Sequence, residues 1–314
     1  MQKSTAPPTD GKKKAVYVLV SNPGDHILEM ALLSIASLKR FSPGIAAEVL
    51  LDPATNESLS GERYKIRELA DRLTVVDESD PNPMIVSRSI KTRMREFVTG
   101  EFLYLDSDAV PIAPLDDAFT KDHDIALCLD GNVSTPADFV FHEFESKTFR
   151  EMGWPFPVYP YYNAGVMFVK DNPRTHELFR RWHAIWQSCR QRGLFKDQPP
   201  FHKAIEEPGL AIKILPPQYN ALISMYNAGV YKARIMHYST IRFEERDDTI
   251  FHGLVKEIKK TGHIDLEPIA RLSKTWYPWT EPFLKKALAA RSLPIALRAL
   301  QAKLSGERPR LRLS

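Results

Sequence analysis

Short apolar runs alternate with longer segments of helical periodicity along most of the chain, and this alternation constrains the fold more than any other feature. Apolar runs bounded by turn residues are typical of buried strands. Segments whose apolar residues recur at every third or fourth position are typical of helices that cover a sheet. The alternation therefore predicts a mostly parallel sheet connected by crossover helices, which is an α/β fold.

The boundaries of the predicted elements follow from this pattern. One helix begins near Ile27 and ends before the turn residues Ser42-Pro43-Gly44. Two further helices are predicted over residues 85–98 and 176–190. The predicted strands are residues 15–20, 47–51, 73–76, 101–105, 125–129, 165–169, 212–215 and 234–237.

Length and composition set the expected domain organisation. The chain has 314 residues, of which 43% are hydrophobic and 26% are charged, as in an ordinary globular enzyme. We expect a flexible polar tail over residues 1–14, a catalytic domain over residues 15–270 and a basic helical extension over residues 271–314. Two cysteines, Cys128 and Cys189, are too few for a disulfide framework or a zinc site, so we expect buried thiols and a cytoplasmic protein.

The positive charge is concentrated at the C-terminal end. Residues 281–314 contain eight Lys and Arg against two Glu, a net charge of +6, so the preceding 280 residues carry −2 of the total of +4. A nearly neutral body argues against a general nucleic-acid-binding protein. The basic segment fits two alternatives: peripheral contact with the anionic inner face of a membrane, or a helix packed on the domain and followed by a disordered end.

The triplet Asp106-Ser107-Asp108 carries the strongest chemical signal. It directly follows the strand predicted at residues 101–105, and ligands bind at the carboxyl ends of strands in open α/β sheets. Two adjacent carboxylates repel each other unless a cation lies between them, and their oxygens suit Mg²⁺ or Mn²⁺. Such a cation can also neutralise a nucleotide diphosphate. A solvated acidic turn is the alternative interpretation, and the sequence has neither the glycine-rich dinucleotide motif nor a P-loop.

Four motifs occur in an order typical of one enzyme family: residues 101–111 (EFLYLDSDAVP), residues 162–167 (YNAGVM), Asp197-Gln198 and His237-Tyr238. Together they resemble the retaining GT-A glycosyltransferases of the glycogenin-like and lipooligosaccharide galactosyltransferase type, family 8 and its relatives. The resemblance covers roughly residues 15–245. It implies a GT-A fold, in which a Rossmann-like mixed sheet is flanked by helices, here with a C-terminal helical extension.

The resemblance also implies roles for matching positions. Asp106, Asp108 and His237 would bind the metal ion, and this mixture of oxygen and nitrogen ligands favours Mn²⁺ over Mg²⁺. The residues expected at the catalytic centre are Asp197 and Gln198, beside the donor sugar, and Asp130, beside the acceptor. The residues expected to contact the nucleotide-sugar donor are Asn22, Lys91, Arg93, Asp106, Ser107, Asp108, Asn163, Ala164 and Arg242.

Some of the implied phosphate contacts have competitors or depart from the family pattern. Lys91 and Arg93 share their predicted helix with Arg88 and Arg95, which could take the same role. Family members follow the metal histidine with glycine and then lysine. Here the glycine is missing, and Arg242 stands in for the lysine at a different spacing.

The expected activity is hexosyl transfer from a nucleotide-diphosphate sugar to a glycan, lipid-linked or protein acceptor, with retention of anomeric configuration. Two alternatives stay open. An apolar strand followed by this acidic triplet is also the nucleophile motif of haloacid-dehalogenase-like phosphatases, in which Asp106 would be phosphorylated and Asp108 would act as acid and base. Those enzymes normally carry the motif on their first strand. The other alternative is a GT-A module that binds a nucleotide sugar without catalysis.

Overall fold

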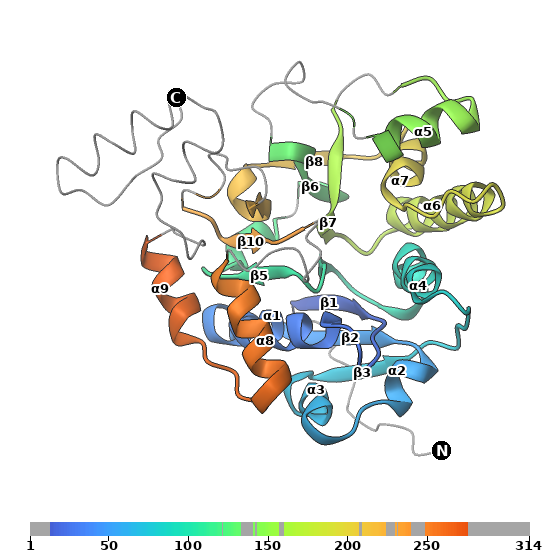
Figure 1. Cartoon of the computed structure of the whole chain (residues 1–314). Helices are drawn as coiled ribbons and strands as arrows, with labels where there is room; N and C mark the ends of the chain where they lie inside the picture. The colour runs from blue at the N-terminus through green and yellow to red at the C-terminus, as the bar shows by residue number, and fades with distance from the viewer. Residues whose placement is uncertain are drawn as a thin grey trace.

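The structure is a computed structural model. It describes residues 13–120, 122–132, 141, 143–156, 160–206, 209–223, 230, 232–239 and 249–275. Figure 1 shows the arrangement of its helices and strands.

A mixed seven-stranded sheet forms the centre of the described part of the molecule. Its strands, in spatial order, are β3 (Arg72–Val75), β2 (Ala46–Leu51), β1 (Lys14–Leu19), β4 (Phe102–Leu105), β7 (Tyr162–Val169), β6 (Ile125–Leu129) and β8 (Ile212–Leu215). Strand β7 runs antiparallel to both of its neighbours, and the other adjacent pairs are parallel. The predicted α/β class and mixed sheet are confirmed.

Both faces of this sheet are covered by helices. Along β1, Ala15 and Tyr17 pack into one hydrophobic core while Val16 and Val18 pack into the other, because successive side chains of a strand point to opposite faces. The first core is closed by α1 (Ile27–Phe41) and α8 (Ile250–Thr261), and the second by α4 (Pro83–Phe97), α6 (Pro173–Arg190) and α7 (Gln198–Ile205).

A small three-stranded sheet lies beside the large one. Its central strand β10 (Ile235–His237) runs antiparallel to β5 (Ala109–Pro111) and parallel to β9 (Ala221–Leu222). The remaining α-helices are α2 (Pro53–Glu57), α3 (Lys65–Leu69), α5 (Glu143–Met152) and α9 (Glu267–Thr275). The small sheet brings a late segment of the chain to the residues that directly follow β4.

Most predicted boundaries differ from the observed ones by one to three residues, and three of these differences have a clear physical cause. Strand β1 begins at Lys14 rather than Ala15, because the Lys14 side chain is buried in an ion pair with Glu48 at 3.3 Å. Strand β7 begins at Tyr162 rather than Gly165, because Tyr162 pairs with the end of β6. Helix α6 begins at Pro173, since a capping box at Asn172 starts it one turn early.

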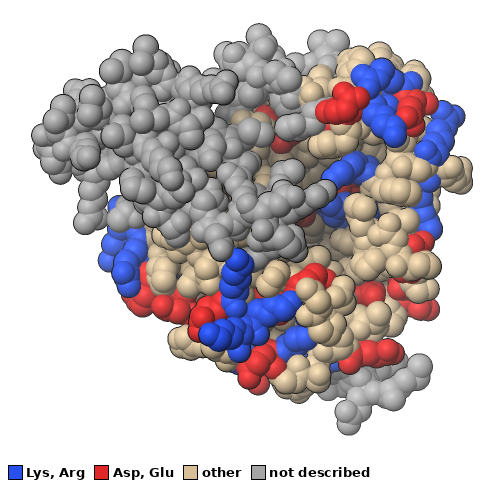
Figure 2. Space-filling model, viewed as in Figure 1, with Lys and Arg blue, Asp and Glu red and all other residues tan. Residues whose placement is uncertain are grey.

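The described surface carries both signs of charge. In the view of Figure 2, Lys and Arg side chains lie beside Asp and Glu side chains rather than forming a face of one sign. Among the helices that the structure describes, none combines the length and apolar character that a membrane span requires.

Candidate active site

The acidic triplet lies where the topology of the sheet opens a crevice. Strands β1 and β4 are neighbours, but their connections lead to opposite sides of the sheet, because the order runs β3-β2-β1 on one side and β4-β7 on the other. Ligands bind outside the carboxyl ends of strands at such a switch point. Asp106 follows β4 directly, and Asn22 follows the end of β1.

The pairing of the small sheet brings His237 to the triplet. Strand β5 begins at Ala109, directly after the triplet, and His237 lies opposite Ala109 in the antiparallel pair of β5 and β10. The Tyr238 amide donates a hydrogen bond to the Asp108 carbonyl at 3.0 Å, and the Asp106 amide donates one to the Gly165 carbonyl at 2.8 Å. The turn is therefore attached to both sheets.

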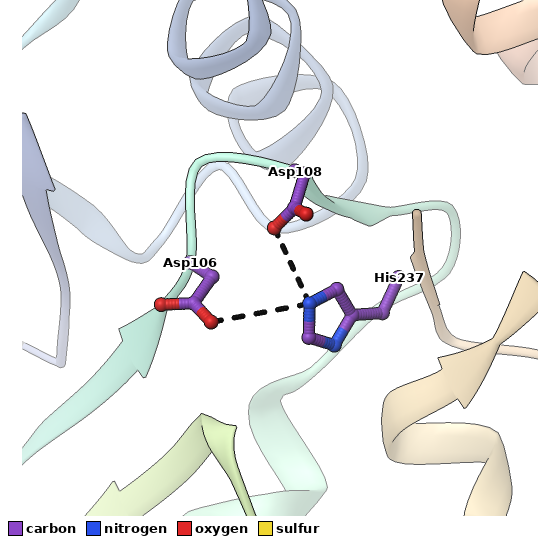
Figure 3. Close-up of side chains that lie close together, drawn as sticks. All are labelled: Asp106, Asp108 and His237. Atoms are coloured by element: carbon purple, nitrogen blue, oxygen red, sulfur yellow. Dashed lines mark ion pairs between the residues drawn. The ribbon is translucent and has the colours of Figure 1, made fainter. Parts of the chain in front are cut away.

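Asp106, Asp108 and His237 form a compact group of possible metal ligands (Figure 3). The His237 Nε2 atom lies 3.2 Å from Asp108 Oδ1 and 3.9 Å from Asp106 Oδ2. One ligand atom from each residue lies within 4.8 Å of the other two. Two carboxylate oxygens and an imidazole nitrogen at this spacing fit a divalent cation of the Mn²⁺ or Mg²⁺ type.

Gly165 leaves the space that this group occupies. A Cβ atom at residue 165 would overlap the His237 ring and lie 2.7 Å from Asp106 Oδ2. Any side chain at this position would therefore displace two of the three candidate ligands. This explains physically why glycine stands in the middle of the 162–167 motif.

Two buried asparagines orient His237. Its Nδ1 atom lies 2.7 Å from Asn220 Oδ1, and the Asn220 amide donates to Asn163 Oδ1 at 2.9 Å. A hydrogen bond at Nδ1 directs Nε2 toward the carboxylates, as is usual for histidines that bind metals. Burial alone would lower the pKa of His237, but the Asp108 and Asp106 carboxylates outweigh it and raise the pKa.

Asp106 is held by contacts to one of its two oxygens. Its Oδ1 atom accepts a hydrogen bond from the Tyr104 hydroxyl at 2.5 Å and one from Lys91 Nζ at 3.1 Å. Burial, followed by the nearby Asp106 charge, raises the pKa of Tyr104 well above its usual value, so the hydroxyl keeps its proton and donates. Oδ2 is thereby left facing His237 (Figure 3).

Two cations of α4 hold Asp197. Lys91 Nζ lies 3.0 Å from Asp197 Oδ2, and Arg88 Nε lies 2.8 Å from Asp197 Oδ1. Burial would raise the pKa of Asp197, but Arg88 and Lys91 more than offset this and hold the pKa well below its usual value. Asp197 is therefore an ionised carboxylate fixed on both oxygens.

The prediction of Arg93 as a donor contact needs correction. Arg93 pairs with Glu78 and Glu96 outside the cavity. Arg95 lies on the same face of α4 as Lys91 but one turn later, away from the carboxyl ends of the strands, where it donates to the Gly100 carbonyl. The helix cations at the site are Lys91 and Arg88.

A second set of polar side chains forms the floor of the same cavity. Asp130 accepts hydrogen bonds from the Asn163 amide at 2.8 Å and the Gln198 amide at 2.9 Å. The Gln198 amide also donates to Glu145 at 3.2 Å, and Gln198 Oε1 accepts from the Ala164 amide nitrogen at 3.4 Å. Sequence reasoning missed Glu145 and Asn220, since neither lies beside a recognisable motif.

A cavity of about 320 Å³ is lined by the three candidate metal ligands, by Arg88, Lys91 and Asp197, and by Asp130, Asn163 and Gln198. Phe144 and Lys196 also line it, at the α5 and α7 side. A larger and more open groove of about 710 Å³ lies at the other end of the strands, where β6 begins and β7 ends. It runs along Asp124, Lys170 and Asp171. Its charged side chains are paired with one another or with backbone groups, so the smaller cavity is the candidate active site.

The other predicted site residues have these positions. Asn22 is exposed beyond β1, with its side chain bonded to the Gly24 amide, and does not line the cavity. Ser107 is half-buried within the turn between the two aspartates. Arg242 lies outside the described residues, as do residues 1–12 of the predicted tail and residues 276–314 of the predicted helical extension.

Fold and sequence together define the class of protein. A mixed sheet of this order, with a helix-covered core on each face, is the GT-A type of glycosyltransferase fold. The family model of the nucleotide-diphospho-sugar transferases matches residues 99–262, more than half of the chain. The chain belongs to this family. The phosphatase interpretation is therefore rejected, and the triplet indeed follows β4 rather than the first strand.

Solved structures share this fold at low sequence identity. The glycosyltransferase GlyE of Streptococcus pneumoniae TIGR4 is 17% identical, with a TM-score of 0.53 over 86% of this chain; the chain spans 66% of the GlyE chain, just under two thirds. An active-site mutant of LgtC is 15% identical, with a TM-score of 0.52 over 82% of this chain and 100% of its own. The galactosyltransferase LgtC, in complex with donor and acceptor sugar analogs, is 14% identical, with a TM-score of 0.50 over 81% of this chain and 98% of its own. No curated protein matches the chain in sequence.

Proposed function

We propose that this chain transfers a hexose from a nucleotide-diphosphate donor to a hydroxyl group of a glycan, lipid-linked or protein acceptor, with a divalent cation held by Asp106, Asp108 and His237. One observation carries the proposal: these three side chains converge within 4.8 Å, around the space that Gly165 leaves, on the wall of a cavity at the sheet's switch point. The imidazole ligand favours Mn²⁺.

A cation bound there supplies charge stabilisation for the diphosphate as the bond to the sugar breaks. The protein contributes preorganised polar groups around that position. Lys91 lies next to Asp106, and Arg88 lies one helical turn earlier, so both add positive charge on the α4 side. We assign Asn22 and Ser107 to the nucleotide end of the donor and Arg242 to its phosphates.

The donor sugar would lie over Asn163, Ala164 and Gln198, with Asp130 between the sugar and the acceptor. The carbon–oxygen bond to the diphosphate breaks, and the oxygen of the acceptor hydroxyl forms the new glycosidic bond. The proton of that hydroxyl passes to an oxygen of the departing diphosphate. Asn163 and Gln198 both donate to Asp130, which fixes this carboxylate at the boundary.

We propose retention of anomeric configuration by front-face displacement. Asp197 is a carboxylate of the kind that can act as a covalent nucleophile. Ion pairs with Arg88 and Lys91, however, occupy both of its oxygens. A carboxylate held in this way is a weak nucleophile, which favours direct transfer. An inverted product, identified by the anomeric coupling constant in proton NMR, would exclude this mechanism.

Substitution of a metal ligand tests the proposal. Asp108→Asn keeps the side-chain shape but removes one negative charge, so we expect loss of Mn²⁺-dependent nucleotide binding and of transfer. Binding to a panel of nucleoside diphosphates, with and without Mn²⁺, can be measured by thermal shift; a ligand at 100 times its Kd stabilises the fold by about 2.7 kcal/mol.

The exposed Asp116→Asn is the matched control, and it should behave like the unaltered chain. Nucleotide binding by Asp108→Asn that is undiminished and independent of Mn²⁺ would contradict the proposed metal site. Mn²⁺-dependent binding by the unaltered chain, without transfer to any acceptor, would instead indicate a non-catalytic nucleotide-sugar-binding module.

The proposed domain organisation assigns this chemistry to residues 15–270 and a separate role to the basic C-terminal residues. We propose that residues 281–314, with their net charge of +6, hold the enzyme at an anionic membrane surface. A lipid-linked acceptor would then be within reach.

A further inference from the structure

Lys196 is a cation of the active-site cavity that the proposed chemistry leaves without a function. In the part of the chain that the structure describes, three Lys or Arg side chains line the cavity: Arg88, Lys91 and Lys196. Arg88 and Lys91 are neutralised by Asp197, and Lys91 also by Asp106. Among the described residues, no carboxylate lies within ion-pair distance of the Lys196 ammonium group. This group instead makes a cation–π contact with an aromatic ring. An unneutralised cation in a cavity is suited to binding an anion.

That aromatic ring belongs to Phe144. It is half-buried in α5, lines the cavity and lies with its centroid 5.0 Å from Lys196 Nζ. Helices α5 and α7 pack against each other, and Lys196 lies in the loop two residues before α7, so this packing brings the pair together. Because Lys196 Nζ lies over this ring, the two side chains can contact one sugar together, the ring through its uncovered apolar surface and the ammonium group through a polar substituent.

In Figure 1, helix α5, which carries Phe144, lies on the other side of β7 from β10, the strand that carries His237. A line of hydrogen bonds runs along the floor from His237 through Asn220 and Asn163 to Asp130. It continues through the Gln198 amide to Glu145, the residue next to Phe144 in α5. Several side chains thus separate the metal-binding end from the end that carries Phe144 and Lys196.

This separation assigns the pair to the acceptor rather than to the donor diphosphate. The diphosphate must reach Asp106, Asp108 and His237, whereas Asp130 marks the boundary at which the acceptor begins under the proposed function. Asp130 and Glu145 accept hydrogen bonds from the Gln198 amide, and neither carboxylate lies within ion-pair distance of Lys196.

We propose that Phe144 and Lys196 form an acceptor subsite for an anionic sugar, in which Phe144 packs against the sugar ring and Lys196 binds a phosphate or carboxylate on or next to that ring. The proposal rests on the proposed function, since it uses the same cavity. It adds the chemical class of the acceptor: a phosphorylated or acidic sugar in place of a neutral one.

Matched sugars test the proposal directly. We would measure, by ligand-observed NMR and transfer kinetics, the binding of glucose and galactose each in three forms: methyl hexoside, hexose 6-phosphate and hexuronate. The full chain would be saturated with Mn²⁺ and donor. We expect the phosphate form, the carboxylate form or both to bind at least about tenfold more tightly than the neutral form, the effect of one charge-assisted hydrogen bond. The form that is preferred identifies the source of the anion.

Substitutions then assign the preference to the subsite. Lys196→Gln should remove the preference for anionic sugars, and Lys196→Arg should keep it. Phe144→Leu should weaken the binding of neutral and anionic sugars alike. Lys147→Gln is the control, because Lys147 lies on α5 but pairs with Glu151 outside the cavity. The preference should also fall as salt is raised, since Lys196 is exposed.

Three results would overturn the proposal. The first is that no anionic form binds more tightly than its neutral partner in the unaltered chain. The second is that Lys196→Gln leaves the preference intact. The third is that Lys196→Gln raises the Kd for nucleoside diphosphate and Mn²⁺, which would assign Lys196 to the donor. Failure of the proposed function would give a different result from failure of the subsite. Anion-selective sugar binding would persist, but no sugar would receive a hexose.

Discussion

At the scale of single residues, the candidate metal site depends on side chains that fix the orientation of its ligands. Tyr104 and Lys91 both bind Oδ1 of Asp106, and Asn220 binds Nδ1 of His237. Each contact leaves the other polar atom of the ligand directed at the shared space. Such supporting contacts commonly change metal affinity by about 10- to 100-fold when they are removed.

The space at Gly165 gives a prediction at this scale. Gly165→Ala should reduce Mn²⁺-dependent nucleotide binding by about tenfold or more, because the added methyl group displaces His237 and Asp106. Overpacking should also lower the free energy of unfolding by about 1 to 3 kcal/mol. Isothermal titration with Mn²⁺ and nucleoside diphosphate, beside a urea titration, measures both effects.

Gly253→Ala is the matched control, since a Cβ atom there meets no other atom within 4 Å and the residue lies in the exposed part of α8. It should keep full nucleotide binding and gain about 0.5 to 1 kcal/mol of stability. Unchanged Mn²⁺ affinity in Gly165→Ala would show that the ligands do not close around this space.

At the scale of elements, helix termini decide where the supporting helices begin. Helix α6 starts at Pro173 because the Asn172 side chain accepts from the Thr175 backbone amide at 3.1 Å and the Asn172 backbone amide donates to the Thr175 hydroxyl at 3.3 Å. This helix carries Trp182, whose indole nitrogen donates to the Asp197 carbonyl at 2.8 Å. The helix that sequence periodicity placed at residue 176 therefore extends one turn further and also supports the active site.

Asn172→Ala should lower the free energy of unfolding by about 1 to 2 kcal/mol through loss of the cap. Asn172→Ser, which retains a cap acceptor, should recover most of this loss in a urea titration. Equal destabilisation by both substitutions would attribute the effect to the hydrogen bond from Asn172 to Asp124 instead. Nucleotide binding should be unchanged, because Asn172 lies at the end of the strands that faces away from the cavity.

At the scale of the whole molecule, charge is divided between a nearly neutral body and a basic C-terminal segment. Residues 1–280 carry a net charge of −2 and residues 281–314 carry +6, so the C-terminal segment supplies the net attraction to an anionic membrane. The face seen in Figure 2 mixes both signs of charge. Each Lys or Arg near such a surface contributes about 1 kcal/mol.

This division gives a prediction for membrane binding. The full chain should sediment with vesicles that contain phosphatidylglycerol and remain in solution with phosphatidylcholine vesicles. Replacement of Arg308, Arg310 and Arg312 by Gln should weaken sedimentation, by about 3 kcal/mol in binding free energy. Equal sedimentation with both kinds of vesicle, or no effect of the substitutions, would contradict a role of the segment at anionic membranes.

The sequence by itself determined the local features of this protein. Apolar runs and helical periodicity located the sheet strands and the main helices, because side-chain periodicity is a property of neighbouring residues. The position of Asp106 and Asp108 at a strand end was likewise local, since strand and triplet are contiguous. Helix α8 was missed although its signals, the Thr249 cap and left-handed Gly262, are also local.

Only the tertiary structure decided which distant side chains meet. His237 reaches Asp108 because β10 pairs with β5 in one register, and Arg88 rather than Arg93 joins Lys91 because of how α4 packs on the sheet. Phe144 and Lys196 line the cavity, and Glu145 accepts a hydrogen bond from Gln198, because α5 packs beside α7. Register and packing depend on contacts between residues far apart in the chain, and no local pattern encodes them.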